Sequence, residues 1–229
     1  MRERGKIMDI YLDTANEQEI EFASKYGFLA GITTNPSIIS RENREFRQII
    51  VDISSKINGE VWCQVTGETA EEMILEGREM STWGKDIVIK LPMTEEGLSA
   101  AYQLKQEGIK VNMTLIYTLP QVVLAAKAGV DFISPYIGRM DDHAIDGLQF
   151  IKEAKEIIHQ MHAETKVIGA SIRNPQVVVD LAKSGADAVT MPFYIFKKMF
   201  ASDLTNIGLK GFLNDWKQYQ SAKKSEKSY

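Results

Sequence analysis

The stretch Asp86-Ile-Val-Ile-Lys-Leu-Pro-Met-Thr-Glu-Glu-Gly-Leu98 places a short apolar run directly before the start of a helix. Its isoleucine and valine side chains suit a strand that is buried on both faces. Thr94 precedes two glutamates, which is typical of a helix N-cap followed by an acidic first turn. The stretch therefore predicts a strand, a short loop and a helix that begins near Thr94.

The same order of strand, loop and helix recurs along the whole chain. Gly129 and Gly185 each follow an apolar helix pattern and precede a new strand, as helix C-cap glycines do. Eight such units in 229 residues predict a single (β/α)8 barrel of parallel strands, with a doubly wound open sheet as the second architecture. The expected strands are 9–12, 30–33, 61–65, 87–91, 110–114, 131–135, 166–170 and 186–191.

The two ends of the chain lie outside this pattern, although we expect 1–229 to form one domain. Met8 begins the first apolar strand pattern, so residues 1–7 form a possible extension. Residues 203–229 predict a C-terminal helix and tail. Four large apolar residues of this helix share one stripe, which has to be buried under the barrel or on another subunit. They are Leu204, Ile207, Phe212 and Trp216.

Composition and charge exclude several classes of protein. The net charge is −4 without a long basic stripe, so neither nucleic acid nor an anionic membrane is an expected partner. No apolar run approaches the roughly 20 residues that span a bilayer, and the first residues lack the apolar core of a signal peptide. Cys63 is the single cysteine, so no intrachain disulfide can form, which fits a cytoplasmic location.

Metal and nucleotide cofactors find no support in the sequence. His143, His159 and His162 all lie in or beside the sixth helix pattern, away from the strand ends, and no third ligand joins the last two. No glycine-rich dinucleotide motif or Walker-type loop is present. We therefore expect neither a metal nor a nucleotide cofactor.

Polar residues follow nearly every expected strand. In a (β/α)8 barrel the active site is built from side chains at the carboxyl ends of the strands, so these residues are expected to converge. The candidate site residues are Asp13, Thr33, Asn35, Gln64, Lys90, Asn112, Thr114, Ser134, Tyr136, Arg139, Ser171 and Arg173.

Lys90 is the only lysine at the carboxyl end of an apolar strand, because Lys110 and Lys166 stand at strand starts. Burial disfavours the charged form of an ammonium group, and a free amine in a barrel can attack a ketone to form an imine. Two other interpretations are open. The lysine could snorkel to the barrel rim, or it could form a structural pair with Asp13.

The remaining candidates each allow a functional and a structural interpretation. Asp13 could hold a proton or stabilise an iminium ion, or it could cap the helix that begins near Asn16. Thr114 and Tyr136 carry hydroxyl groups that could orient a water molecule or simply be satisfied in the core. If Gln64 points into the barrel, the neighbouring Cys63 points toward the helices, and its thiol is then an inert part of the core.

Two arginines are candidates for holding a phosphate group. The guanidinium fork matches the oxygens of a phosphate, and Arg139 and Arg173 both follow late strands of the pattern. The alternative for each is an ordinary surface arginine.

Five stretches of the chain together resemble one family, the short transaldolases with fructose-6-phosphate aldolase. The resemblance spans nearly the whole chain in the family's order, and it implies a barrel, no cofactor, sugar-phosphate substrates and homo-oligomers, often pentamers or decamers in which the C-terminal helix reaches a neighbour. The stretches are Leu12-Asp-Thr14, Gly31-Ile-Thr-Thr-Asn-Pro-Ser37, Ile89-Lys-Leu-Pro92, Ser134-Pro-Tyr-Ile-Gly-Arg139 and Ala170-Ser-Ile-Arg-Asn174.

By this resemblance, Lys90 is the imine-forming lysine and Asp13 the acidic residue beside it. Asn35 resembles the amide that binds a substrate hydroxyl. The phosphate is expected at Arg139, Ser171 and Arg173.

The resemblance is mixed between the two branches of the family. Gln64, Thr114 and Tyr136 are similar to the aldolase branch, whereas transaldolases have Glu at the position of Gln64 and commonly Phe at that of Tyr136. Asn112 and Arg173 resemble transaldolases. Because Gln64 and Tyr136 stand where protons move, we expect an aldolase that cleaves fructose 6-phosphate to dihydroxyacetone and glyceraldehyde 3-phosphate. The alternatives are a transaldolase of the pentose phosphate pathway and, more remotely, a non-catalytic sugar-phosphate-binding barrel.

Overall fold

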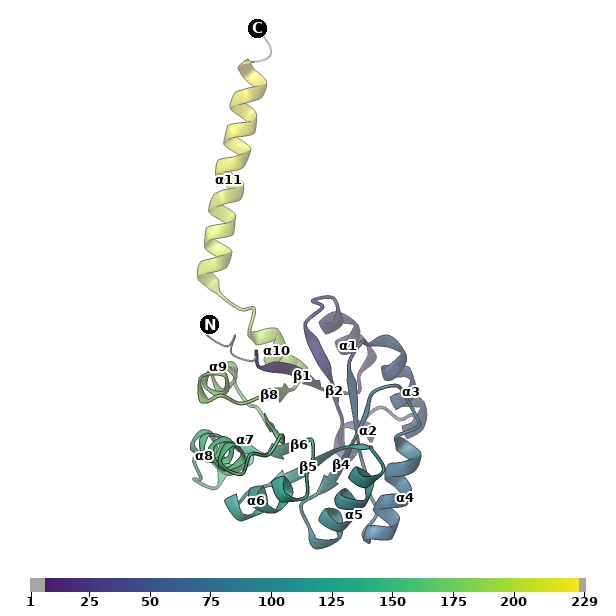
Figure 1. Cartoon of the computed structure of the whole chain (residues 1–229). Helices are drawn as coiled ribbons and strands as arrows, with labels where there is room; N and C mark the ends of the chain where they lie inside the picture. The colour runs from purple at the N-terminus through teal and green to yellow at the C-terminus, as the bar shows by residue number, and fades with distance from the viewer. Residues whose placement is uncertain (1–6, 227–229) are drawn as a thin grey trace. The chain divides into compact units, whose positions relative to one another are not determined.

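The computed structural model describes residues 7–226, and its core is a closed barrel of eight parallel strands (Figure 1). The strands pair in sequence order, and the eighth pairs with the first. This is the predicted (β/α)8 barrel, and it excludes the doubly wound open sheet. The strands are β1 Asp9–Asp13, β2 Leu29–Thr33, β3 Glu60–Gln64, β4 Ile87–Pro92, β5 Lys110–Ile116, β6 Phe132–Pro135, β7 Lys166–Gly169 and β8 Ala188–Met191.

Each expected strand is present, and its ends lie within two residues of the expected ones. Up to residue 196, helices follow the strands and surround the barrel (Figure 1). The short helices α2, α7 and α10 are additions to the expected pattern. The helices are α1 Glu17–Ser24, α2 Pro36–Ile39, α3 Phe46–Lys56, α4 Ala70–Met80, α5 Glu95–Gln106, α6 Leu119–Lys127, α7 Ile137–Asp142, α8 Gly147–Gln160, α9 Pro175–Ser184, α10 Phe193–Lys198 and α11 Asp203–Glu226.

Local signals set where the helices begin and end. The Thr94 hydroxyl accepts a hydrogen bond of 3.0 Å from the backbone N–H of Gly97 and caps α5, as predicted. Gly185 ends α9 at φ 79°, and Gly129 follows α6 at φ 72°. Glycine adopts this left-handed conformation without a side-chain penalty, so the chain turns directly into the next strand.

Side chains along each strand alternate between the barrel interior and the surrounding helices. Tyr11, Trp62 and Phe132 pack inside the barrel, with the Trp62 ring centroid 4.6 Å from that of Phe132 and 5.1 Å from that of Tyr11. Cys63 belongs instead to the apolar layer that includes the helices, and burial raises the pKa of its thiol to about 12. The residues that follow Tyr11, Trp62 and Phe132 by two positions along their strands therefore face inward again, at the carboxyl ends of the strands.

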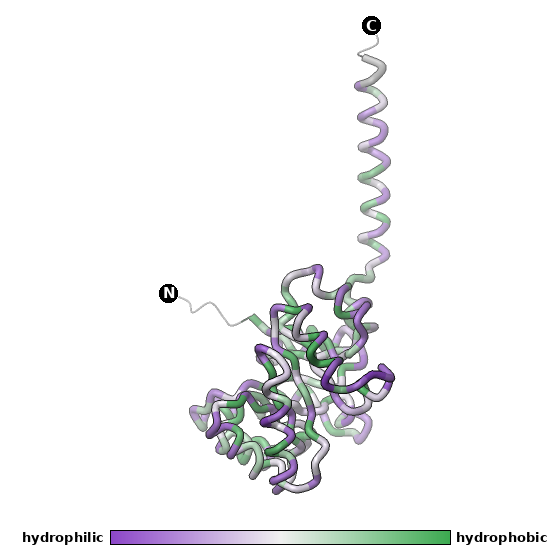
Figure 2. The backbone as a smooth tube through the Cα atoms, turned by 90° about the vertical axis from the view of Figure 1, so that its right-hand side faces the viewer, coloured by the Kyte–Doolittle hydropathy of each residue, from purple (hydrophilic) through white to green (hydrophobic). Residues whose placement is uncertain are grey.

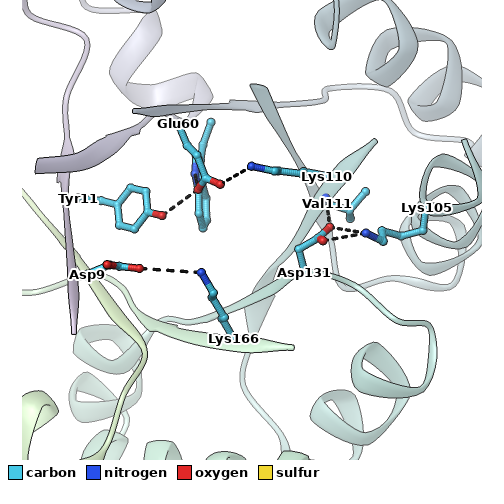
Figure 3. A network of polar contacts seen from close by, with 9 residues as sticks. Asp9, Tyr11, Glu60, Lys105, Lys110, Val111, Asp131 and Lys166 are labelled. Carbon is cyan, nitrogen blue, oxygen red and sulfur yellow. Dashed lines mark hydrogen bonds and ion pairs between the residues drawn. The ribbon is translucent and has the colours of Figure 1, made fainter. Parts of the chain in front are cut away.

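Charged residues gather at the amino ends of the strands (Figure 3). Lys110 Nζ lies 2.8 Å from a Glu60 carboxylate oxygen, and Lys166 Nζ lies 3.9 Å from Asp9. These lysines stand at strand starts, as predicted, and each has a carboxylate partner. Lys90 is thus separated from them by the aromatic interior of the barrel.

The chain divides into two compact units, Met1–Phe196 and Lys197–Tyr229, of which the second contains α11. Hydrophilic and hydrophobic residues alternate along this helix (Figure 2). Phe212 is 75% exposed and Trp216 is 56% exposed. The expected extension and tail fall partly on residues 1–6 and 227–229, which lie outside the described residues. Within 7–226, no helix combines the length and apolarity needed to cross a bilayer.

Candidate active site

Two cavities lie at the carboxyl ends of the strands. The inner cavity has a volume of about 130 Å³, and the outer cavity has a volume of about 740 Å³. Asp13, Asn35, Tyr136 and Arg139 line both of them, so the cavities meet at these residues. The inner cavity is lined by Asp13, Thr33, Asn35, Trp62, Lys90, Ser134, Tyr136, Arg139, Ala170, Ser171 and Thr190.

Lys90 faces the inner cavity from β4, two positions after Val88 of the barrel interior. The residue is 4% exposed, and its Nζ donates a hydrogen bond of 2.7 Å to the backbone carbonyl of Thr34. The interpretation that it snorkels to the barrel rim is therefore wrong. A water molecule takes about 30 Å³ in the liquid, so the inner cavity has room for a small polar molecule in front of the amine.

Asp13 ends β1 and lines the inner cavity together with Lys90. Burial raises the pKa of the Asp13 carboxyl group, while the charge of Lys90 and a 2.8 Å hydrogen bond from the Thr33 hydroxyl oppose that rise. The interpretation of Asp13 as a helix cap is wrong, because the Asn16 side chain accepts from two backbone amides at the start of α1. Asp13 thus shares the inner cavity with the amine of Lys90, but no ion pair within 4.0 Å joins the two side chains among the ion pairs of the described residues.

Asparagine side chains approach the inner cavity in two ways. Asn35 caps α2, with its amide oxygen 3.0 Å from the backbone nitrogen of Ile38. That bond uses the oxygen, so the amide nitrogen can donate into the cavity. Asn112 is fully buried and lines neither cavity, but its amide oxygen accepts a hydrogen bond of 2.8 Å from Ser134, which does line the inner one. Asn112 therefore positions Ser134.

Gln64 and Tyr136 line the outer cavity, as expected for residues that could hold a water molecule. The neighbouring thiol of Cys63 faces the helix layer, which confirms the predicted alternation on β3. Thr114 differs from the expectation, because it is fully buried and lines neither cavity. Its hydroxyl has no hydrogen-bond partner among the described residues. The structure thus brings two of these three side chains to the cavity.

Strained backbone occurs at two residues of the cavity walls. Leu115 has φ 61° at a bulge in β5 and lines the outer cavity, while Ser171 has φ 64° and lines the inner one. A left-handed conformation costs a non-glycine residue about 1–3 kcal/mol and concentrates at functional sites. Leu115 could not be found from the sequence, because leucine is not a residue type that favours this conformation.

One arginine and one hydroxyl meet at the edge of the inner cavity. Arg139 lines both cavities, and its guanidinium carbon lies 4.9 Å from the centroid of the Tyr136 ring. Ser171 reaches the same cavity from the loop after β7. A Cβ atom on Gly138 would overlap the backbone carbonyl oxygen of Ser171, so glycine permits α7 and this loop to approach closely. Such a pair can hold an anionic group.

Arg173 lines neither cavity. Its guanidinium makes a two-pronged ion pair with the carboxylate of Asp142, and one of the two N–O distances is 2.6 Å. This pair holds the pKa of the Asp142 carboxyl group below its ordinary value. Arg173 nevertheless lies close to the start of α7, since a Cβ atom on Gly138 would lie 3.1 Å from its Nε. Its contact with a phosphate stays a prediction.

Thr190 is a cavity residue that the sequence analysis missed. It lies near the end of β8 and lines the inner cavity, and its hydroxyl oxygen lies 2.6 Å from that of Thr33. The signal was present, since Thr190 is a polar residue near the end of the expected strand 186–191. Polar residues at the carboxyl ends of the expected strands were the candidates, and Thr190 meets the same criterion.

The fold and this site define the class of protein as a (β/α)8-barrel with a cavity centred on a buried lysine. A buried amine that faces a cavity at the carboxyl ends of barrel strands can form an imine with a carbonyl compound. Within residues 7–226, no three His, Cys, Asp or Glu side chains form a group that could hold a metal ion.

The chain belongs to the transaldolase/fructose-6-phosphate aldolase family, whose sequence model matches residues 10–227. It is 43% identical over 217 residues to a probable transaldolase of Lactiplantibacillus plantarum, a match that covers 95% of this chain and 100% of the relative. It is 44% identical over 214 residues to a probable transaldolase of Moorella thermoacetica, covering 93% of this chain and 100% of the relative. The chain is therefore an enzyme of the transaldolase/aldolase class.

A solved structure of low sequence identity shares the barrel alone. The carboxyl transferase domain of Rhizobium etli pyruvate carboxylase matches with a TM-score of 0.61 at 12% identity. The match covers 82% of this chain and 40% of that longer chain. Because fold does not determine function, this likeness supports only the architecture.

Proposed function

We propose that this enzyme transfers a dihydroxyacetone unit from a ketose phosphate to an aldose phosphate through an imine on Lys90, which is the transaldolase reaction. The observation that carries the chemistry is the amine of Lys90, 4% exposed and facing the inner cavity. The named relatives support transfer in preference to the simple aldol cleavage expected from the sequence.

The proposed reaction begins when the Lys90 amine attacks the ketone carbon of fructose 6-phosphate. Loss of one water molecule gives an iminium ion, which accepts the electron pair of the breaking carbon–carbon bond. Glyceraldehyde 3-phosphate leaves, and a three-carbon enamine stays on the lysine. Attack of this enamine on an aldose phosphate, followed by addition of water, releases the new ketose phosphate and restores the amine.

Asp13 is the proposed base for the bond-breaking step. The hydroxyl next to the breaking bond has to lose a proton as it becomes an aldehyde. A carboxylate with a raised pKa takes up that proton more readily than an ordinary aspartate. The positive iminium would in turn be stabilised by the ionised carboxylate of Asp13 on the same cavity wall.

The remaining cavity residues are proposed to bind the substrate. Asn35 and Ser134 are placed to hydrogen-bond the sugar hydroxyls, and Ser134 is held in turn by Asn112. Arg139 and Ser171 are proposed to hold the phosphate group. Arg173 would join them only after it leaves Asp142.

A second candidate function is aldol cleavage with release of free dihydroxyacetone. Gln64 and Tyr136, which line the outer cavity, favour it. An amide and a phenol can hold a water molecule that protonates the enamine, whereas transfer requires the enamine to stay unprotonated until the acceptor arrives. Thr114 lines neither cavity, so its hydroxyl would not contact this water directly.

A product assay distinguishes the two reactions. Transfer predicts that fructose 6-phosphate reacts only when erythrose 4-phosphate is present, and that no free dihydroxyacetone accumulates. Aldol cleavage predicts free dihydroxyacetone from fructose 6-phosphate alone. Borohydride with dihydroxyacetone should add mass to the wild type and to the control Lys183→Met, but not to Lys90→Met. If Lys90→Met is still labelled, the imine lies elsewhere and the proposed mechanism is wrong.

We also propose that the enzyme works as a homo-oligomer. The support is α11, whose exposed Phe212 and Trp216 form part of an apolar stripe. A second copy of the chain would remove this stripe from water, which is the main driving force for most protein association.

A further inference from the structure

Three side chains of neighbouring strands form a continuous hydrogen-bonded chain at the inner cavity. Thr33 on β2 donates to Asp13 on β1 over 2.8 Å, and the hydroxyl oxygens of Thr33 and Thr190 lie 2.6 Å apart. Thr33 is 1% exposed and Thr190 is 6% exposed. Since β1 lies between β2 and β8 in the barrel, the two threonines reach each other past the strand that carries Asp13.

The direction of this chain follows from counting protons. A threonine hydroxyl has one proton to donate. When the carboxylate of Asp13 is ionised, Thr33 gives its proton to that carboxylate, so the short contact with Thr190 has to be donated by Thr190. The order of donation is then Thr190 to Thr33 to Asp13.

The order reverses when Asp13 is neutral and carries its proton on the oxygen that faces Thr33. Its carboxyl proton can then be donated to Thr33, Thr33 can donate to Thr190, and Thr190 can donate to an acceptor in the inner cavity, which it lines. Both orders use the same heavy-atom positions and differ only in the rotation of two hydroxyl groups. The chain therefore satisfies the carboxyl group in both of its protonation states.

We propose that Thr190 is a positioning residue that acts through Thr33 and allows Asp13 to take up and release a proton during bond cleavage. The inference rests on the proposed function, in which Asp13 is the base. Without the Thr190 hydroxyl, Thr33 could still donate to an ionised Asp13. Opposite a neutral Asp13 that carries its proton on the oxygen facing Thr33, however, the Thr33 proton would be a buried donor without an acceptor, which is the costly case. The loss therefore falls on the state in which that oxygen of Asp13 holds the proton.

The competing interpretation is purely structural, with the two threonines tying β2 to β8. Separate measurements of imine formation and of bond cleavage distinguish them. Trapping of dihydroxyacetone by borohydride reports imine formation without breaking a carbon–carbon bond. Turnover of fructose 6-phosphate with erythrose 4-phosphate requires the proton transfer to Asp13 as well.

The test compares Thr190→Val, which keeps the shape and removes the hydroxyl, with Thr190→Ser, which keeps the hydroxyl. We expect kcat of Thr190→Val to fall about tenfold or more, with KM and the trapping rate within about threefold of wild type. Thr190→Ser should recover most of kcat. If Thr190→Val does not fold, Thr190→Ala removes the same hydroxyl without added strain and takes the same measurements.

Each other outcome overturns the inference. Wild-type kcat in Thr190→Val shows that the hydroxyl is not needed, and an equal loss of trapping and turnover shows a general disturbance of the site. A Thr190→Ser variant as slow as Thr190→Val has the same consequence. Failure of the wild type to trap dihydroxyacetone is distinct, because it overturns the proposed function and the inference with it.

Discussion

Arg173 and Asp142 face each other as a two-pronged ion pair at the edge of the site, with one N–O distance of 2.6 Å. Both side chains are about half exposed, so the pair competes with water and with dissolved anions. A phosphate that reached Arg173 would replace the carboxylate oxygens of Asp142 by phosphate oxygens. A phosphate that bound Arg173 would therefore have to displace Asp142.

If Arg173 binds the phosphate, Asp142→Ala should free its guanidinium and lower KM for fructose 6-phosphate several-fold. Arg173→Ala should raise KM, and adding Asp142→Ala to it should change nothing further, because the two residues act through one contact. Steady-state kinetics of the two single variants and the double variant measure this. Unchanged KM in all three would leave Arg173 as a surface ion pair.

The partition between transfer and release should depend on Gln64 and Tyr136. Changing both, as Gln64→Glu with Tyr136→Phe, removes the amide and the phenol that could hold a proton-donating water. We expect the ratio of free dihydroxyacetone to transferred dihydroxyacetone to fall about tenfold. The control is borohydride trapping, which should stay near the wild-type rate. An unchanged ratio would mean that neither side chain controls the fate of the enamine.

Asp13→Asn should alter the pH dependence of stability as well as activity. Because the folded pKa of Asp13 is raised above its ordinary value of 3.8, this carboxyl group holds its proton in the folded protein at pH values where it has lost it in the unfolded chain. The contribution of Asp13 to stability therefore falls as pH rises through this window. Asparagine does not titrate. Urea unfolding at about pH 4 and about pH 7 should show the variant gaining stability relative to wild type at the higher pH. A difference that is constant or of opposite sign contradicts the raised pKa.

Gly138→Ala should damage both stability and phosphate binding. The new Cβ would overlap the backbone carbonyl of Ser171, which cannot move as a flexible side chain could. We expect a loss of about 1–3 kcal/mol in the free energy of unfolding and a higher KM for phosphorylated substrates. Gly211→Ala in α11 is the matched control, because nothing lies within 4 Å of its added Cβ. Equal effects of the two substitutions would show that the close approach of Gly138 is unimportant.

Phe212→Glu in α11 should reduce the oligomeric state, because it places a charge on the apolar stripe proposed to meet another copy. Light scattering after size-exclusion chromatography measures the mass directly. Lys217→Glu changes charge on the same helix and serves as the control. A wild type that is monomeric at micromolar concentration would remove the basis for the proposed oligomer.

The barrel could be predicted because its signals are local. Runs such as Ile87 to Leu91 are buried on both faces, and Thr94 and Gly185 mark helix ends through their own backbone chemistry. The inward direction of Lys90 and Gln64 follows from the two-residue period of a strand. Those features need no knowledge of the rest of the fold.

The details that could not be predicted depend on contacts between distant segments. Arg173 forms an ion pair with Asp142, which lies 31 residues earlier in the chain, and no local sequence pattern marks that pair. Thr114 is fully buried and lines neither cavity, although it stands near the carboxyl end of β5 like the other candidates on their strands. A sequence pattern gives the direction of a side chain but not its depth below a cavity.

The thiol of Cys63 has a practical consequence for experiments on this enzyme. It is fully buried, and with a pKa of about 12 it carries almost no thiolate at neutral pH. Alkylating reagents should therefore leave the native chain unmodified while it is folded. A cysteine introduced on an exposed surface would be the sole target of a fluorescent or spin label, with no prior removal of the natural one. Slow modification of Cys63 would then report transient opening of the barrel wall.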